Sequence, residues 1–270
     1  MACAYAAPPA PSPDAAIRFL TAEAAAEPPG PSFSICTLVN DRAQYAAMVE
    51  SFTAGGFGPE VAEFIALDTT GNLRCDAFQG IPRLLAAASR RYVVLCHQDV
   101  RLLEDGAAVL LARLAELDRL DPHWALAGNA GGTAAGGLAI RISDPHGEGQ
   151  RRGALPARAV SLDENFIVLR RAAPVGLSAD MAGFHLYGAD LCLQARLAGR
   201  SAWVIDFHLR HLSPGRRDVA FDRAQVEFER KYAQLFAGVR RIRTTCTELR
   251  LRRSWIGQWL RRRRLARLQG

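Results

Sequence analysis

The chain has 270 residues, of which 49% are hydrophobic and 23% are charged. A chain of this size can bury a full core as one large domain or two small ones, and its composition argues against wholesale disorder, collagen and coiled coil. No run of about 18 uncharged apolar residues occurs, which argues against a membrane-spanning helix. The first residues, MACAYAAPPAPSPD, lack the basic region of a secretory signal.

The charge is unevenly distributed along the chain. The whole chain carries +7, and residues 238–270 contain eleven arginines and one acid, Glu248, which gives +10. The part before Gly238 therefore carries −3. A mildly acidic body with a strongly basic C-terminal segment is predicted.

The six cysteines are scattered and form no C-x-x-C motif. Most lie inside apolar runs, where a free thiol behaves as a small hydrophobe. This usage is typical of a reducing compartment, so we expect a cytoplasmic protein.

Taken in chain order, the pattern predicts a flexible N-terminus and then an α/β domain. Residues 1–31 are rich in Ala and Pro, which favours a flexible or extended segment. Apolar runs that alternate with helical periodicity predict a mostly parallel central sheet flanked by helices. We expect strands at 33–39, 61–68, 92–99 and 124–131, and helices around 45–52, at 78–90 with an interruption near Pro82, and at 106–120.

The second half is less regular. Residues 131–156 are rich in Gly and Arg and predict loops or a small meander. Further on, we expect a strand at 166–171, a helix at 190–198, a strand that runs into a loop at 201–213, and a helix at 221–235.

Polar residues follow the first three predicted strands, as Asn40-Asp41, Asp68 and His97-Gln98-Asp99. In open parallel sheets, ligands bind beyond the carboxyl ends of the strands. An acid there can hydrogen-bond a nucleoside, and an acid or His can hold a divalent cation against a diphosphate. Any one of these acids could equally well cap a helix or a turn. The G-x-G-x-x-G and P-loop patterns are absent, which disfavours dinucleotide and P-loop binding.

Five segments together resemble the family-2-type glycosyltransferases of the GT-A fold, over residues 33–214. They read FSICTLVND, EFIALDTTGN, FQGIPRLLAAA, YVVLCHQDVRLLEDG and HLYGADLCLQARLAGRSAWVIDFHLRHLS. The closest likeness is to the subgroup whose metal motif reads HQDV. The resemblance implies a single GT-A-like domain over residues 32–237. Such a domain would move a sugar from a nucleotide-sugar donor to a hydroxyl of a glycan or lipid-linked acceptor.

The resemblance also implies roles for individual residues. The donor nucleotide would be bound by residues at the ends of the predicted strands, namely Thr37, Asn40, Asp41, Asp68 and Gln98. A divalent metal, Mn²⁺ or Mg²⁺, would be held by Asp99 with His97. His211 is the best match for a further metal or phosphate ligand, and His208 is the second.

Two positions depart from the family pattern. His97 stands in place of the first metal-binding acid, and Gly188 stands where the family's base is usual. Asp190 is the nearest carboxylate and our candidate general base for an inverting transfer, although it could instead cap the following helix. Asp163 and Glu164 are the reserve bases. These departures also support an alternative, a catalytically inactive GT-A-like domain that binds nucleotide-sugar or glycan.

The basic segment 238–270 is predicted to be amphipathic, with a helix within residues 249–270. Helical spacing groups its apolar residues on one face, namely Leu249, Trp255, Ile256, Trp259 and Leu260. Trp and Leu opposite many cations are typical of a helix on an anionic membrane surface, which would place the protein peripherally at the inner face of the cell membrane. The same face could instead pack on the domain or on another subunit. Binding of nucleic acid or another polyanion is disfavoured, because no nucleic-acid-binding fold is recognised and the body is acidic.

Overall fold

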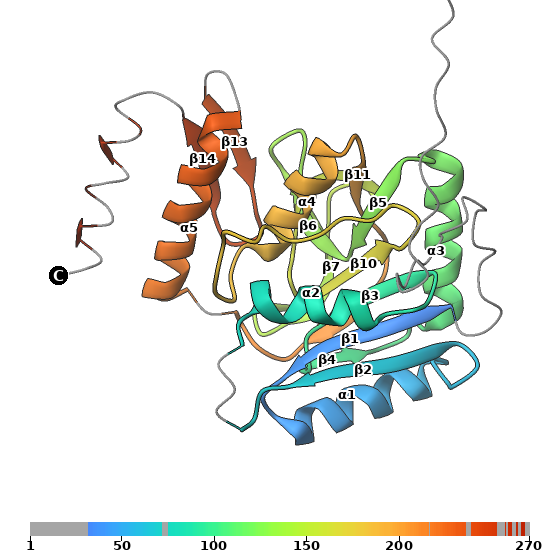
Figure 1. The fold of residues 1–270 in the computed structure, drawn as a ribbon. Coiled ribbons are helices and arrows are strands. Elements are labelled where there is room, and N and C mark those ends of the chain that lie inside the picture. The colour runs from blue at the N-terminus through green and yellow to red at the C-terminus, as the bar shows by residue number, and fades with distance from the viewer. Residues whose placement is uncertain are drawn as a thin grey trace, which may run out of the picture.

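Helices cover both faces of a long, curled β-sheet in the computed structural model of the chain (Figure 1). The structure describes residues 32–71, 75–215, 217–235 and 239–252, and then residues 257, 259, 260, 263, 266 and 267. The expected flexible segment 1–31 lies outside the described residues, as do Trp255 and Ile256 of the expected tail helix. No helix in the described part is long and apolar enough to cross a membrane.

The first half alternates strands and helices as expected. Its elements are β1 (Phe33–Val39), α1 (Arg42–Ala54), β2 (Ala62–Asp68), α2 (Ala77–Ala87), β3 (Tyr92–Cys96), β4 (Val100–Leu102), α3 (Ala107–Leu120) and β5 (Trp124–Gly128). Aspartates start two of these helices. Asp41 accepts hydrogen bonds from the first backbone N–H groups of α1, and Asp76 does the same for α2. Such N-caps satisfy donors that the helix itself cannot pair.

The second half contributes short strands and two further helices. Its elements are β6 (Ala130–Thr133), β7 (Leu138–Asp144), β8 (Gly147–Arg152), β9 (Ala157–Leu162), β10 (Phe166–Arg170), α4 (Tyr187–Leu197), β11 (Ser201–Val204), β12 (Leu209–His211), α5 (Val219–Tyr232), a 3₁₀ turn (Ala233–Leu235), β13 (Val239–Arg243) and β14 (Glu248–Arg252). The meander expected for 131–156 is present as β6, β7 and β8.

Several element boundaries differ from the sequence prediction. The strand expected at 92–99 ends at Cys96, so His97 lies in the turn between β3 and β4. Helix α2 continues through Pro82, because a proline removes one backbone hydrogen bond without always ending a helix. Helix α4 begins at Tyr187 rather than at Asp190.

The α/β class is confirmed, but the expectation of a mostly parallel sheet is wrong. The strand order is β2-β1-β3-β10-β5-β11-β9-β6-β7-β12-β4, with β8 paired to β7. The group β2-β1-β3 is parallel, whereas β10 runs antiparallel to both β3 and β5. Short turns join the antiparallel pairs β6–β7 and β7–β8, whereas β10 reaches its partners β3 and β5 from a distant part of the chain.

Two apolar clusters fix the helices on the sheet. Helices α1 and α3 pack on one face through side chains such as Phe52 and Leu114, and α2 and α4 pack on the other through Ile81 and Leu191. Ser51 of α1 also bonds to the backbone of β4, with its Oγ 2.8 Å from the N–H of Leu102. The last strand of the sheet thereby returns to the helix that follows the first strand, which closes the curl.

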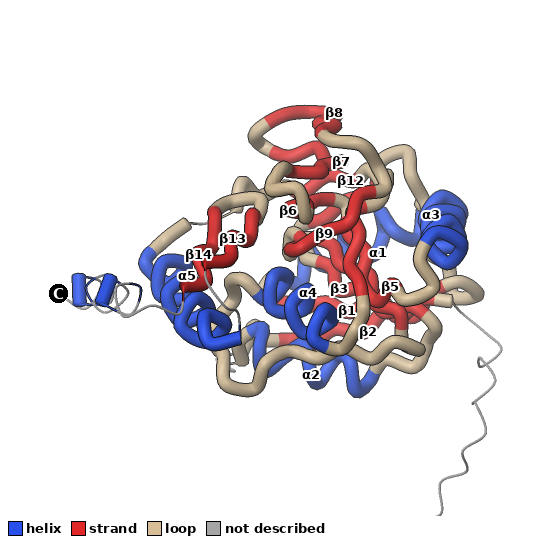
Figure 2. The backbone as a smooth tube through the Cα atoms, turned by 90° about the horizontal axis from the view of Figure 1, so that it is seen from above, coloured by secondary structure: helices blue, strands red, loops and turns tan. Residues whose placement is uncertain are grey.

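Residues 239–252 form the hairpin β13–β14, so the helix expected within residues 249–270 is wrong for residues 249–252. Its apolar residues Ile242, Leu249 and Leu251 are buried against α5, and Figure 2 shows the hairpin beside that helix. A Cβ at Gly132 would lie 1.8 Å from the carbonyl oxygen of Arg243, so the hairpin also closely approaches β6. Apolar and basic residues alternate in ELRLR, which is the period of a strand.

Candidate active site

The ends of β1 and β3 are joined by the side chain of Gln98. Its Oε1 accepts hydrogen bonds from the N–H groups of Asn40 and Asp41, each at 3.0 Å, and its Nε2 donates to Oδ1 of Asn40. In the parallel pair β1–β2, Val39 lies in register with Asp68, so Asp68 ends the neighbouring strand at the same edge. The structure therefore brings four of the five expected donor-binding residues to one edge of the sheet.

The side chains at this edge have local hydrogen-bond partners. Asp41 caps α1 through Oδ1, 2.9 Å from the N–H of Ala43. Asp68 accepts hydrogen bonds from the N–H and hydroxyl of Thr70 and from Arg42, and these interactions lower its pKa to about 2. Thr37, the fifth expected donor residue, is buried in β1, and its Oγ1 has no hydrogen-bond partner among the described residues.

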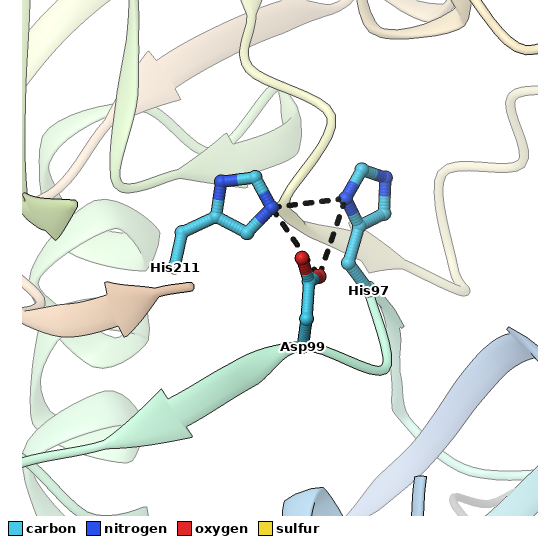
Figure 3. Close-up of side chains that lie close together, drawn as sticks. All are labelled: His97, Asp99 and His211. Carbon is cyan, nitrogen blue, oxygen red and sulfur yellow. Dashed lines mark hydrogen bonds and ion pairs between the residues drawn. The ribbon is translucent and has the colours of Figure 1, made fainter. Parts of the chain in front are cut away.

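His97, Asp99 and His211 form a compact cluster beside this edge (Figure 3). Nε2 of His211 lies 3.3 Å from Oδ1 of Asp99 and 3.4 Å from Nδ1 of His97, and the latter lies 4.0 Å from the same Asp99 oxygen. His211 reaches the cluster because β12 pairs antiparallel with β4, which begins directly after Asp99. Strands far apart in the sequence thus bring together the three expected metal ligands.

Tyr187, at the start of α4, orients the ring of His97. Its hydroxyl donates a hydrogen bond to the carbonyl oxygen of Glu164 at 2.9 Å and lies 2.9 Å from Nε2 of His97. Because the hydroxyl proton is used for Glu164, its oxygen accepts the proton of His97 Nε2. The lone pair of Nδ1 then faces Asp99 and His211, which is the tautomer that a metal ligand requires.

Asp99 and His211 carry opposite charges in the metal-free protein, whereas His97 is neutral. Burial disfavours the charged form of Asp99, but its hydrogen bond and ion pair with His211 outweigh this and hold its pKa well below the ordinary value. Burial likewise opposes the charge on His211, but the same contact raises the His211 pKa. For His97, burial and the neighbouring His211 lower the pKa, so this ring is neutral.

The cluster fits a first-row divalent metal ion. Bonds of about 2.1 Å with angles between 90° and 110° separate ligand atoms by roughly 3.0–3.5 Å, and two of the three separations here are 3.3 and 3.4 Å. Two imidazole nitrogens with one carboxylate oxygen suit Mn²⁺ better than Mg²⁺, which prefers oxygen ligands.

The turn between β9 and β10 lies against the cluster. The N–H of His97 donates to the carbonyl oxygen of Asn165 at 3.0 Å, and Tyr187 contacts the carbonyl of Glu164. The carboxylate of Asp163 is engaged, since it accepts hydrogen bonds of 2.6 Å from Asn165 and from Thr245 of the β13–β14 turn. The carboxylate of Glu164, the other reserve base, interacts instead with backbone N–H groups at the start of α4.

Glu164 occupies the space beside Gly188, the position where the family's base is usual. The N–H of Gly188 donates to Oε1 of Glu164 at 3.3 Å. A Cβ at Gly188 would lie 3.3 Å from Cγ of Glu164 and 2.3 Å from the carbonyl oxygen of Leu162, so a side chain there would displace its neighbours. Burial and the nearby Asp163 raise the pKa of Glu164 to about 8.

Asp190, the expected general base, lies in a buried hydrogen-bond network. It is 0% exposed, and its carboxylate accepts hydrogen bonds from the N–H of Ser178 at 2.8 Å, the hydroxyl of Ser178 at 2.7 Å and the hydroxyl of Tyr232. These contacts tie α4 to α5 and to the loop before α4. The side chain is neither exposed nor the N-cap of α4, which is Leu186.

His208, the second choice for a metal or phosphate ligand, does not join the cluster. Its Nε2 lies 2.9 Å from the hydroxyl of Ser143, and its backbone N–H donates to Asp105. The ring serves instead to hold β7 beside the segment that precedes β12.

No protein-family model matches the chain. A protein of Fuscovulum blasticum, "ATP synthase subunits region ORF 6", is 42% identical over 212 residues, which cover 76% of this chain and 85% of that protein. The chain belongs to the same family as this ORF 6 protein. The name of the relative states no activity.

Solved structures similar to this ORF 6 family member are distant. The mannosyltransferase PcManGT from Pyrobaculum calidifontis, in complex with GDP-Man and Mn²⁺, has a TM-score of 0.46 at 10% identity over 77% of this chain and 64% of its own. Residues 1–349 of TarS from S. aureus have a TM-score of 0.45 at 12% identity over 74% of this chain and 65% of that chain. In both cases the chain spans less than two thirds of the other protein, and the likeness is one of general fold.

Two residues of the site escaped the sequence analysis of this ORF 6 family member. Tyr187 and Asn165 contact His97 but match no motif by themselves. Tyr187 directly precedes Gly188, the position where the family's acid is usual. This neighbouring position was the only sequence feature that could have indicated it. Asn165 contributes a backbone carbonyl, which no residue type could have revealed.

Proposed function

We propose that this protein is a GT-A-type glycosyltransferase that moves a sugar from a nucleotide-sugar donor to a hydroxyl of an acceptor. The observation that carries the proposal is the cluster of His97, Asp99 and His211 at the carboxyl end of β3, beside the ends of the parallel strands β1 and β2. This edge of a sheet is where nucleotide ligands bind in α/β proteins. The motifs resembling family-2 enzymes include these same residues.

In this proposal the donor nucleotide lies against the ends of β1 and β2. Asp68 offers a carboxylate to the nucleoside, and Thr37 and Asn40 line the neighbouring strand. Gln98 holds the backbone of Asn40 and Asp41 in place through its hydrogen bonds, and it thereby sets the distance between the nucleoside end and the metal ligands. Asp41, which caps α1, supports the donor site through the backbone.

A divalent metal, Mn²⁺ rather than Mg²⁺, would be held by His97 Nδ1, His211 Nε2 and Asp99. When bound, such an ion offsets negative charge on the departing nucleoside diphosphate. Tyr187 keeps the His97 ring turned so that Nδ1 is free to bind. The hydroxyl of Ser213 lies 3.1 Å from this same Nε2 of His211, so it would give up this contact when a metal ion binds there.

Glu164, rather than Asp190, is the proposed general base. The acceptor oxygen forms a bond to the anomeric carbon while the bond to the diphosphate oxygen breaks, and the hydroxyl proton passes to Glu164. This direct displacement inverts the anomeric centre. A pKa of about 8 suits a base near neutral pH, because a base is most effective when its pKa lies close to the working pH. Asp190 is buried and fully engaged, so an acceptor cannot reach it.

The acceptor class proposed is a glycan or a lipid-linked intermediate. Trp259 and Leu260 of the basic tail are 46% and 51% exposed. Large apolar side chains with many nearby arginines favour contact with an anionic membrane surface, where a lipid-linked acceptor resides. The proposed location is therefore the cytoplasm, with peripheral attachment to the membrane.

Thermal unfolding against a panel of UDP-, GDP-, dTDP- and CDP-sugars, each with and without Mn²⁺, tests the proposal. We expect one nucleotide to raise the melting temperature in the presence of Mn²⁺, because a ligand at 100 times its dissociation constant stabilises the native state by about 2.7 kcal/mol. No shift with any donor would contradict a donor site. A shift without hydrolysis or transfer would favour a nucleotide-sugar-binding domain that has lost catalysis.

The affinity for Mn²⁺ should increase with pH through the raised pKa of His211. Below that pKa a proton on Nε2 competes with the metal, so the affinity should rise about tenfold per pH unit and then level off. Calorimetric titration with Mn²⁺ between pH 5.5 and 8 measures the effect, and a flat profile would contradict it.

The stability of the metal-free protein should depend on pH in the opposite direction and decrease as pH rises. The His211–Asp99 pair contributes fully below the ordinary histidine pKa of 6.5 and is lost as pH rises through the raised value.

A further inference from the structure

A cavity of about 290 Å³ lies between the second half of α4 and the strands β9, β11 and β13. Four arginines line it, namely Arg158, Arg196, Arg200 and Arg240, and no carboxylate does. Apolar side chains, among them Leu193 and Ile242, form the rest of its wall. The cavity thus combines an apolar lining with four positive charges.

This cavity is separate from the candidate active site. Tyr187 contacts the metal cluster at the first residue of α4, whereas Arg196 lies nine residues further along the same helix. At 1.5 Å per residue, the two positions are roughly 13 Å apart along the helix axis. A ligand at the arginines would not touch His97, Asp99 or His211.

Two of the four arginines, Arg196 and Arg200, are not balanced by a carboxylate of the described residues, and a third shares its partner. Arg158 lies 3.3 Å from Asp121 and over the ring of Trp203. The same Asp121 oxygen also accepts hydrogen bonds from Ser201 and Trp203, so its charge is shared. In the described part of the chain, the guanidinium groups of Arg196 and Arg200 have no ion pair.

The helix dipole explains part of this arrangement. Cations near the C-terminal end of a helix are favourable, and Arg196 lies in the last turn of α4. That effect does not account for Arg158 of β9 or Arg240 of β13, which reach the same cavity from two strands. Arg158 and Arg196 are exposed, so water screens part of the repulsion between these like charges, and an anion bound between the arginines would be attracted by them.

We propose that this cavity binds a phosphate ester, with the arginines on the phosphate oxygens and the apolar wall against the attached carbon skeleton. Guanidinium groups match phosphate through paired N–H donors, which makes arginine the side chain best suited to this ligand. The phosphate could belong to a soluble organic phosphate or to a phospholipid headgroup. The proposal does not depend on the glycosyltransferase assignment, because the cavity and the metal cluster share no residue.

The test compares R196Q/R200Q with the matched control R83Q/R119Q, which removes two exposed helix arginines away from the cavity. Calorimetry measures the binding of glycerol 3-phosphate and of pyrophosphate. EDTA in the buffer excludes binding through a metal at Asp99. Sedimentation with phosphatidylcholine vesicles, with and without phosphatidylglycerol, tests the lipid source. Circular dichroism and melting temperatures establish that both variants are folded.

Binding of a soluble phosphate that weakens about tenfold or more in R196Q/R200Q, but not in the control, supports the proposal and identifies a soluble ligand. Binding to phosphatidylglycerol vesicles that weakens in the same selective way supports it and identifies a lipid headgroup. Absence of binding to every probe overturns the proposal. An equal loss of binding in both variants also overturns it. So does vesicle binding that is unchanged in R196Q/R200Q, because other basic residues would then bind the vesicles.

Discussion

Replacing Asp99 with asparagine should abolish Mn²⁺ binding and lower sugar transfer by at least about a hundredfold. Asp99 is the only carboxylate in the cluster with His97 and His211, so the substitution leaves the ion with two neutral ligands and an amide. The donor should then lose its Mn²⁺-dependent shift in melting temperature. Asparagine has nearly the same size, and the backbone carbonyl of residue 99 still accepts the N–H of Leu212, so the fold should be retained.

Asp180→Asn is the matched control for this change. Asp180 is exposed and pairs with Lys231, so this variant also removes one charge and one ion pair, but away from the cluster. Calorimetric titration with Mn²⁺ and a transfer assay on both variants separate the roles. If the Asp99 variant bound Mn²⁺ and donor as tightly as the parent protein, the metal site would lie elsewhere.

Replacing Glu164 with glutamine should abolish transfer while donor and Mn²⁺ binding persist. Loss of a general base lowers turnover by about 10²–10⁴-fold. Glutamine keeps an oxygen that can accept the N–H of Gly188, so the start of α4 should remain intact. The expected result is therefore a loss in kcat with little change in the apparent affinity for the donor.

The same variant should become more stable than the parent protein as pH increases. Folding raises the Glu164 pKa from 4.5 to about 8, so the ionised carboxylate destabilises the folded state increasingly between these values. Glutamine removes this cost, so the melting temperature of E164Q should equal that of the parent below pH 4.5 and exceed it above pH 8. An inactive variant with higher stability is difficult to explain by misfolding.

Asp190→Asn is the contrasting control. Its carboxylate accepts three buried hydrogen bonds, so the substitution should destabilise the fold by about 2–3 kcal/mol while a folded fraction keeps its activity. Full transfer by E164Q, or loss of transfer in a well-folded D190N, would return the base to Asp190.

The candidate metal ligands could be proposed from sequence because two of them follow one strand. His97 and Asp99 lie in one short turn, and the polar ends of neighbouring parallel strands must meet at the same edge. His211 was also proposed, by its place after a late strand. Its contact with Asp99, however, depends on the antiparallel pairing of β12 with β4, a strand of three residues that periodicity did not predict.

The proposed general base illustrates what local patterns cannot show. The motif around Gly188 placed Asp190 first, because it is the nearest carboxylate along the chain. In the fold, Asp190 faces α5 and is buried, whereas Glu164 arrives at Gly188 from a turn 24 residues earlier. Which of two carboxylates reaches the site depends on how β9 and β10 sit beside α4, and this is set by contacts between distant segments.

Sequence alone determined the α/β class, most of the first-half elements and the residues that follow β1, β2 and β3, because apolar periodicity and strand-end chemistry are local properties. Tertiary structure alone decided the mixed sheet, the role of Tyr187, the position of Glu164 and the hairpin made by the first part of the basic tail. Antiparallel pairing depends on the register of two distant strands and leaves no sequence motif. In the basic tail, pairing of β13 with β14 and packing against α5 favour a strand in a segment whose periodicity also allowed a helix.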